Sequence, residues 1–258
     1  MRKIRVRYHP EESRLYRHLF SEVHFFAGVA VRADRLVITI DGPSGAGKST
    51  CARLLAGRLG IPYLDTGALY RAVAVEVIRR HIDMDDPEQM KNLCMNLDIR
   101  VQWEEDLLLI FSSGRDVSQE IRSESVGQAA SLVSAKAPVR AALLGLQRQI
   151  IARTGGILEG RDTGTVIAPE AHVKFFLDAD LAERGRRRLR ELRERGMEAQ
   201  LESVIQGICQ RDQQDREREL APLRPARDAV IIDTTSKSIP EVLEEMIKHL
   251  SERLHVKV

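Results

Sequence analysis

The sequence predicts an α/β fold in which helices cover both faces of a parallel sheet. Short apolar and β-branched runs alternate along the chain with longer segments of helical periodicity, and parallel strands need such crossover segments. The first run, at residues 36–41, leads into a glycine-rich turn and then a helical pattern, which makes a complete strand–loop–helix unit. With 43% hydrophobic and 30% charged residues, the composition fits a soluble globular chain and excludes a disordered or fibrous one.

Five short apolar runs are the expected strands of the parallel sheet, at residues 36–41, 61–64, 157–159, 173–177 and 229–232. A helix is expected at 48–59, because leucines recur there at helical intervals and Gly60 precedes Pro62. Three closely spaced runs joined by tight turns, at 98–103, 107–112 and 115–118, predict a small antiparallel insert.

Two segments differ from the rest in charge. Residues 1–35 carry eight basic and four acidic side chains, so this net of +4 exceeds the +2 of the whole chain and leaves the remainder at −2. The basic character therefore gives little support to a nucleic-acid partner, and we expect 1–35 to be a poorly ordered extension. Residues 182–227 are rich in arginine interleaved with acidic residues, a pattern typical of solvated helices.

The three cysteines lie far apart and form no C-x-x-C pair, which argues against a disulfide framework or a zinc site. A reducing cytoplasm is the expected location. The apolar run at 25–31 is too short to span a membrane, so no membrane association is expected.

A phosphate-binding loop is predicted at residues 42–49, which read GPSGAGKS and match G-x-x-x-x-G-K-[ST] between a strand and a helix. Glycines allow backbone N–H groups to turn toward phosphate oxygens, and the helix dipole favours anions there. We expect Lys48 to reach the terminal phosphates and the Ser49 hydroxyl to ligate Mg²⁺ bound with ATP. The expected ATP-binding residues of this P-loop are Gly42, Ser44, Gly45, Ala46, Gly47, Lys48, Ser49 and Thr50.

The P-loop alone leaves motors, GTPases and small-molecule kinases open. A GTPase would need N-K-x-D, which does not occur, and a motor would need a hydrophobic strand ending in an acid pair, which we do not find. A compact phosphotransferase remains.

A second site follows the second expected strand, where LDTGALYR offers Asp65 or Thr66 as a helix cap and places Arg71 in the first turns. A helix start beside an arginine suits a phosphate monoester. The chain also carries, in order, DVSQEIR, GRDTGTVIAPEA, KFFLDA, RDQQDRERELAPL and IDTT. From residue 36 to the C-terminus, these motifs together resemble the bacterial cytidylate kinases.

This resemblance implies transfer of the ATP γ-phosphate to CMP or dCMP in pyrimidine nucleotide metabolism, by a monomer with a nucleoside monophosphate kinase fold. It implies a P-loop core with a five-stranded parallel sheet (36–64, 136–182 and 228–258), an acceptor-binding region with the antiparallel insert (65–135) and a helical lid with acceptor-contact helices (183–227). The chain departs from the family at Ala168, where an aromatic residue is common, and at 1–35, which has no counterpart.

The resemblance also assigns residues. The cytosine would be read by Ser131, Arg140 and Asp162, the acceptor phosphate held by Arg71, Arg161 and Arg218, and the sugar held by Arg211 with Asp215. Ser44 and Thr66 complete the acceptor set. Arg184, Arg187 and Arg188 correspond to lid arginines over the ATP phosphates, and Lys48, Arg161 and Arg187 would be catalytic. Independently, the spacing of residues 211, 215 and 218 predicts one helix face.

Two alternatives stay open. One is a monophosphate kinase that prefers UMP, against which the Asp162 carboxylate argues, because it suits the amine of cytosine better than the carbonyl of uracil. The other is a non-catalytic regulator that senses a nucleotide or binds nucleic acid through its basic N-terminus.

Overall fold

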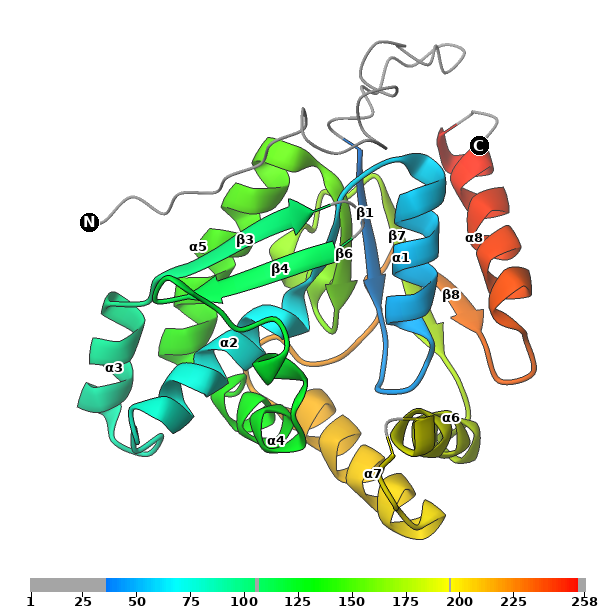
Figure 1. Cartoon of the computed structure of the whole chain (residues 1–258). Helices are drawn as coiled ribbons and strands as arrows, with labels where there is room; N and C mark the ends of the chain where they lie inside the picture. The colour runs from blue at the N-terminus through cyan, green and yellow to red at the C-terminus, as the bar shows by residue number, and fades with distance from the viewer. Residues whose placement is uncertain (1–35, 105–106, 195, 255–258) are drawn as a thin grey trace. The chain divides into compact units, whose positions relative to one another are not determined.

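The computed structural model describes residues 36–104, 107–194 and 196–254 (Figure 1). The expectation of a poorly ordered segment at 1–35 lies outside these described residues. The chain forms two compact units. The first unit is Gly60–Gly156, and the second unit joins Leu36–Leu59 to the residues from Ile157 onward.

The strands form two sheets, which confirms the predicted fold class. The five-stranded parallel sheet has the order β2-β6-β1-β7-β8, with β1 at Val37–Asp41, β2 at Tyr63–Asp65, β6 at Gly156–Gly160, β7 at Val173–Asp178 and β8 at Val230–Asp233. Within the second unit, Ile38 of β1 lies opposite Val173 of β7, and Phe175 of β7 lies opposite Val230 of β8. Every strand of this sheet lies within two residues of its predicted position.

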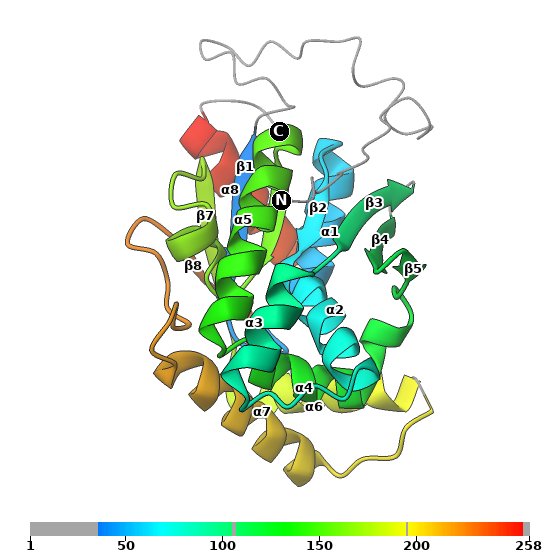
Figure 2. The same cartoon turned by 90° about the vertical axis from the view of Figure 1, so that its left-hand side faces the viewer.

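The three-stranded sheet is the predicted antiparallel insert, formed by β3 (Ile99–Glu104), β4 (Leu107–Ser112) and β5 (Arg115–Asp116). In Figure 2 it lies beside α2 (Thr66–Arg79), which packs against β4. The Ser112 hydroxyl of β4 donates to Oε1 of the buried Glu76 at 2.7 Å, which ties this sheet to that helix.

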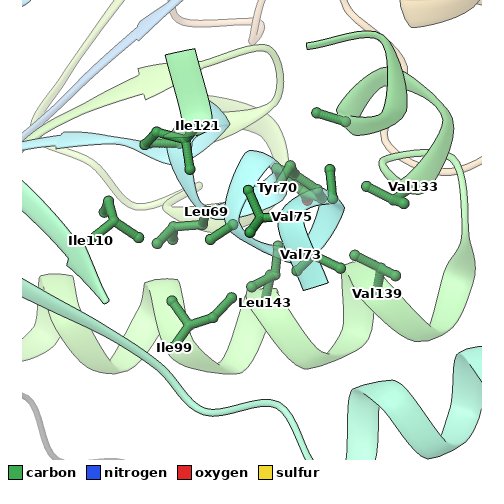
Figure 3. Packing of buried hydrophobic residues seen from close by; sticks show 14 of the residues in the cluster. Leu69, Tyr70, Val73, Val75, Ile99, Ile110, Ile121, Val133, Val139 and Leu143 are labelled. Carbon is green, nitrogen blue, oxygen red and sulfur yellow. The ribbon is translucent and has the colours of Figure 1, made fainter. Parts of the chain in front are cut away.

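Helix α2 is the centre of the first unit. It is apolar nearly all round, so it is buried by its neighbours on several sides. Those neighbours are η2 (Glu120–Arg122), α4 (Glu124–Val133) and α5 (Ala137–Thr154), and α5 also packs against α3 (Pro87–Met95). Figure 3 shows the resulting core, in which Leu69 and Val73 of α2 meet Leu143 of α5.

The second unit holds the P-loop and the charged helices. The first helix, α1, spans Lys48–Leu59 as predicted, and α8 (Ile239–Leu254) packs against it. The arginine-rich segment forms α6 (Leu181–Glu194) and α7 (Leu201–Glu217), which pack on each other. Gly185 permits their close approach, because a Cβ there would lie 2.4 Å from Cγ1 of Ile205.

Among the described helices, none is by itself long and apolar enough to cross a membrane. Only α4 and α5 taken together meet the criteria of length and composition, and they are bent by 100° at their junction.

We predict that Leu143→Ala lowers the free energy of unfolding by about 2–5 kcal/mol, because it leaves a cavity in the core of the first unit. Leu143 is 0% exposed, whereas Leu132 on α4 is 50% exposed, so Leu132→Ala is the matched control and should change stability by less than about 0.5 kcal/mol. Urea unfolding measures both. Equal losses in the two variants would contradict the core described here.

Candidate functional site

The P-loop lies between the last residue of β1 and the first residue of α1. Gly45 and Gly47 have φ values of +78° and +86°, which favour glycine. At Gly42 the limit is space as well, since an added Cβ would lie 1.9 Å from the Leu177 carbonyl oxygen. The loop therefore fits the backbone turn that a phosphate cradle needs.

Lys48 is only 4% exposed, and its Nζ donates to the Pro43 carbonyl oxygen at 2.6 Å within its own loop. Oε1 of Glu159, on β6, lies 3.9 Å from the same Nζ. Burial, and next the charge of Arg161, lower the pKa of Lys48 from 10.5 to about 7. Lys48 is thus a buried amine whose positive charge is only partly balanced by the carboxylate of Glu159.

Ser49 lies beside Lys48 and shares its carboxylate neighbour. The exposed Ser49 donates its hydroxyl to Oε2 of Glu159 at 3.0 Å. A hydroxyl and a carboxylate are hard oxygen donors, so this pair fits Mg²⁺. Sequence reasoning missed Glu159 because it sought an acid pair, although one acidic residue does lie near the carboxyl end of β6, in ILEG.

A network of two arginines and two carboxylates follows β6 and reaches α7. Arg161 Nε donates to Asp215 Oδ2 at 2.9 Å, while Arg218 lies 3.4 Å from both Asp215 Oδ1 and Asp162 Oδ1. Burial opposes the charged form of Arg161, but the charges of Asp215 and Glu159 outweigh it and hold the pKa above its usual value. Four of the predicted acceptor residues are therefore brought together.

The predicted shared face of residues 215 and 218 is confirmed, because Arg218 Nη1 lies 3.4 Å from Asp215 Oδ1, although Arg218 is just beyond the end of the helix. Helix α7 ends at Glu217, and Arg218 is its C-cap with extended backbone, φ −60° and ψ 137°. The turn that follows explains this end, because Ala221 has φ +52° and its carbonyl oxygen accepts from Arg218 Nε at 2.6 Å. Arg211 stays on α7, one turn before Asp215, and its charge contributes to the lowered pKa of Lys48.

Arg184, on α6, forms a buried ion pair with Asp212 of α7. Its Nη1 also donates to the Ser44 carbonyl oxygen at 3.1 Å, and the Ser44 N–H donates to Asp212 Oδ1 at 3.3 Å. Helices α6 and α7 are thus hydrogen-bonded to the P-loop. No local pattern singles out Asp212 among the many acidic residues of this segment.

The other two arginines on α6 differ in their partners. Arg187 Nη1 donates to the Thr234 hydroxyl at 3.0 Å, and that hydroxyl lies 3.2 Å from the Ala46 carbonyl oxygen of the P-loop. Arg188 pairs with Glu191 at 2.8 Å on the surface of the helix. Arg187 is therefore held beside the P-loop by Thr234, which sequence reasoning quoted in IDTT but did not assign.

The remaining predicted residues lie in the first unit. Thr66 is the buried first residue of α2, which Asp65 caps by accepting from the Ala68 N–H at 3.1 Å. Arg71 Nη1 donates to the Ile121 carbonyl oxygen at 3.0 Å.

Arg140 and Ser131 come from the neighbouring ends of α5 and α4. Arg140 Nη1 donates to the Ser134 carbonyl oxygen at 3.1 Å, and its guanidinium lies 5.6 Å from the ring centroid of Tyr70. Ser131 is half-buried on α4, and the Ser134 hydroxyl donates to its carbonyl oxygen at 2.8 Å. These contacts orient the arginine that the resemblance assigns to the base.

The model of the cytidylate kinase family matches residues 38–252. This chain belongs to the cytidylate kinase family. It is 52% identical to the cytidylate kinase of Geobacter sp. (strain M21) over 224 residues, covering 87% of this chain and 96% of that protein. Identity is 50% to the cytidylate kinase of Citrifermentans bemidjiense, with coverage of 87% and 97%, and 44% to that of Vibrio vulnificus (strain CMCP6), with coverage of 84% and 96%. The resemblance drawn from the motifs is confirmed.

We predict that the stability of this protein rises with pH above 7 relative to that of a Lys48→Met variant. The unfolded chain keeps the Lys48 proton up to a pKa near 10.5, whereas the folded protein loses it near 7. Between these values the unfolded state binds more protons, so the difference in unfolding free energy should grow by about 1 kcal/mol per pH unit. Urea unfolding from pH 7 to 9 measures it. The control is Lys91→Met, at an exposed lysine on α3, and a pH-independent difference for Lys48→Met would contradict the assignment.

Proposed function

We propose that this protein transfers the γ-phosphate of ATP to CMP or dCMP, giving ADP and CDP or dCDP. Its membership of the cytidylate kinase family supports this reaction. The observation that carries it is the buried network of Arg161, Asp162, Asp215 and Arg218, which belongs to the same unit as the P-loop lysine. An ATP-binding regulator has no need of a second arginine cluster of this kind.

On the donor side, the charged Lys48 would exchange its bond to Pro43 for one to the terminal phosphates. Arg184, Arg187 and Arg188 of α6 would neutralise the remaining charge, with Arg187 held next to Gly47 by Thr234. Charge spreads over the transferred group during phosphoryl transfer, so the main contribution of these cations is electrostatic stabilisation and alignment. The helical lid predicted at 183–227 would exclude water from the donor.

Mg²⁺ with ATP would be held by the Ser49 hydroxyl, with the Glu159 carboxylate beside it. Such an ion would offset the negative charge of the phosphate groups. Glu159 would also orient Ser49 toward that position, because it accepts a hydrogen bond from the Ser49 hydroxyl.

On the acceptor side, guanidinium groups would bind the CMP phosphate, namely those of Arg71, Arg161 and Arg218. Asp162, Arg140 and Ser131 would read the cytosine, since its amine donates and its ring nitrogen and carbonyl accept. Arg211 and Asp215 would hold the sugar, and Ser44 and Thr66 would complete the acceptor contacts. No general base is needed, because the acceptor phosphate is an anion at neutral pH.

A monomer in the cytoplasm is also our proposal. All three cysteines, Cys51, Cys94 and Cys209, are free thiols, which suits a reducing compartment.

A coupled assay that compares CMP, dCMP, UMP, AMP and GMP with ATP tests the proposed reaction. We expect clear preference for the two cytidine nucleotides. Lys48→Ala shows whether the turnover belongs to this protein, and it should lose about 10² to 10⁴ in kcat. Preference for UMP would favour the first alternative. Turnover of no acceptor, together with RNA or DNA binding that weakens steeply with salt, would favour the regulator.

We predict that Asp162→Asn lowers kcat/KM for CMP by about 10- to 100-fold, because it removes a charged hydrogen-bond acceptor for the cytosine amine. The loss for UMP should be smaller, so the ratio of CMP to UMP use should fall. Steady-state kinetics with both acceptors measure the ratio. Asp98→Asn, at an exposed residue paired with Arg100, is the control. An equal loss with CMP and UMP would mean that Asp162 acts on structure alone.

We predict that Ser49→Ala and Glu159→Gln raise the Mg²⁺ concentration needed for half-maximal activity, with the larger rise for Ser49→Ala because it removes a direct ligand. Titration of activity with Mg²⁺ at fixed ATP measures the change, and ATP binding without Mg²⁺ should stay close to wild type. The control is Ser203→Ala, at an exposed serine on α7. An unchanged Mg²⁺ requirement in both variants would contradict this role of the pair.

A further inference from the structure

Asp41 is a buried carboxylate at the point where the P-loop begins. It is the last residue of β1, directly before Gly42, and only 3% of it is exposed. A buried carboxylate is costly unless donors surround it. Its donors all come from one remote segment: Oδ1 accepts from the Thr163 N–H at 2.9 Å and from the Thr163 hydroxyl at 2.8 Å, and Oδ2 accepts from the Gly164 N–H at 2.8 Å.

Thr163 and Gly164 are the first two residues of η3, a short π-helical turn at Thr163–Ile167. The first N–H groups of a helical segment need acceptors from outside it. The residue in the N-cap position, Asp162, makes no side-chain capping bond to the turn. Asp41, at the end of β1, therefore caps the first turn of η3.

This arrangement separates two tasks that one carboxylate would otherwise have to perform. The Asp162 carboxylate lies 3.4 Å from Arg218 Nη2, on the acceptor side. Because Asp41 accepts from the N–H groups of Thr163 and Gly164, the Asp162 carboxylate is not required to cap them and pairs with Arg218.

The contact between β1 and η3 is also close in space. A Cβ on Gly164 would lie 2.8 Å from the Thr39 hydroxyl oxygen and 3.4 Å from Oδ2 of Asp41. Glycine at this position allows the turn to rest directly on the strand. Burial, opposed by these three hydrogen bonds, raises the pKa of Asp41 to about 6, so the carboxylate remains ionised at pH 7.5.

We propose that Asp41 is a positioning residue for the acceptor. Through Thr163 and Gly164 it fixes Arg161 and Asp162 at a set distance from the P-loop that begins at the next residue, and so aligns the phosphate of CMP with the terminal phosphate of ATP. The proposal rests on the function proposed above. Asp41 would act through these residues and would itself contact neither substrate.

The test compares Asp41→Asn and Asp41→Ala with wild type at pH 7.5. Misplacing the reacting groups by up to about 1 Å lowers the rate of transfer, so kcat/KM for CMP should fall by about 10- to 100-fold in both variants. The loss should be smaller for Asp41→Asn than for Asp41→Ala, because asparagine keeps one acceptor oxygen. The Kd for ATP measured without acceptor should stay within about twofold, since the P-loop residues are unchanged.

Thr163→Val provides a second test of the Asp41–Thr163 contact if the Asp41 variants fold poorly. It removes only the hydroxyl donor and leaves both backbone N–H bonds, so kcat/KM for CMP should fall by about 3- to 10-fold with ATP affinity unchanged. The matched control is Asp86→Asn, because Asp86 caps α3 by accepting from the Glu88 and Gln89 N–H groups at 2.9 and 3.1 Å outside the proposed substrate contacts. Its kinetics should match wild type.

Two results would overturn the inference in an active enzyme. One is wild-type kcat/KM for CMP in the Asp41 or Thr163 variants. The other is a loss of ATP affinity as large as the loss of kcat/KM for CMP, which would place the effect on the P-loop or on the fold as a whole. A wild-type protein that phosphorylates no cytidine nucleotide would instead contradict the proposed function, so the two failures are distinguishable.

Discussion

A site that binds polyanions must keep its cations stable while the anions are absent, and this constraint organises the second unit. Four cations beside the P-loop have a carboxylate as partner or neighbour: Glu159 for Lys48, Asp215 for Arg161, Asp212 for Arg184, and Asp162 with Asp215 for Arg218. An unpaired buried charge would cost several kcal/mol, so these carboxylates are a condition for the fold as well as for the chemistry. The same pairing holds the guanidinium groups in fixed orientations, which reduces the entropy lost when a phosphate binds.

In the first unit, arginine side chains are held within a largely apolar surrounding. Its central helix α2 carries few charged side chains and is buried by α4, α5 and the three-stranded sheet. Within this apolar surrounding, Arg71 and Arg140 are held by the carbonyl oxygens of Ile121 and Ser134. In the second unit, by contrast, Arg161, Arg184 and Arg218 contact carboxylates.

The sequence was sufficient for the strands, the first helix and the P-loop, because each depends on a local pattern. Apolar runs of four to six residues place β1, β6 and β7, and GPSGAGKS places the loop. It was insufficient where a partner is distant in the chain. Nothing local distinguishes Asp212 from the other acidic residues near it, and Glu159 became visible as a partner of Ser49 only when β6 lay near α1. The end of α7 at Glu217 was not predicted, because periodicity alone does not reveal the left-handed backbone at Ala221 that follows it.

The bonds of Asp212 also have a mechanical consequence. This side chain joins helix α7 to the backbone of Ser44, while Arg184 joins the same loop to helix α6. A rotation of α6 or α7 relative to the P-loop would break these hydrogen bonds, so we expect the helices and the loop to move together. Events at the two ends of such a connection are thermodynamically linked, and the linkage has the same size in both directions. The Asp212 carboxylate therefore couples the position of α7 to the backbone of the P-loop.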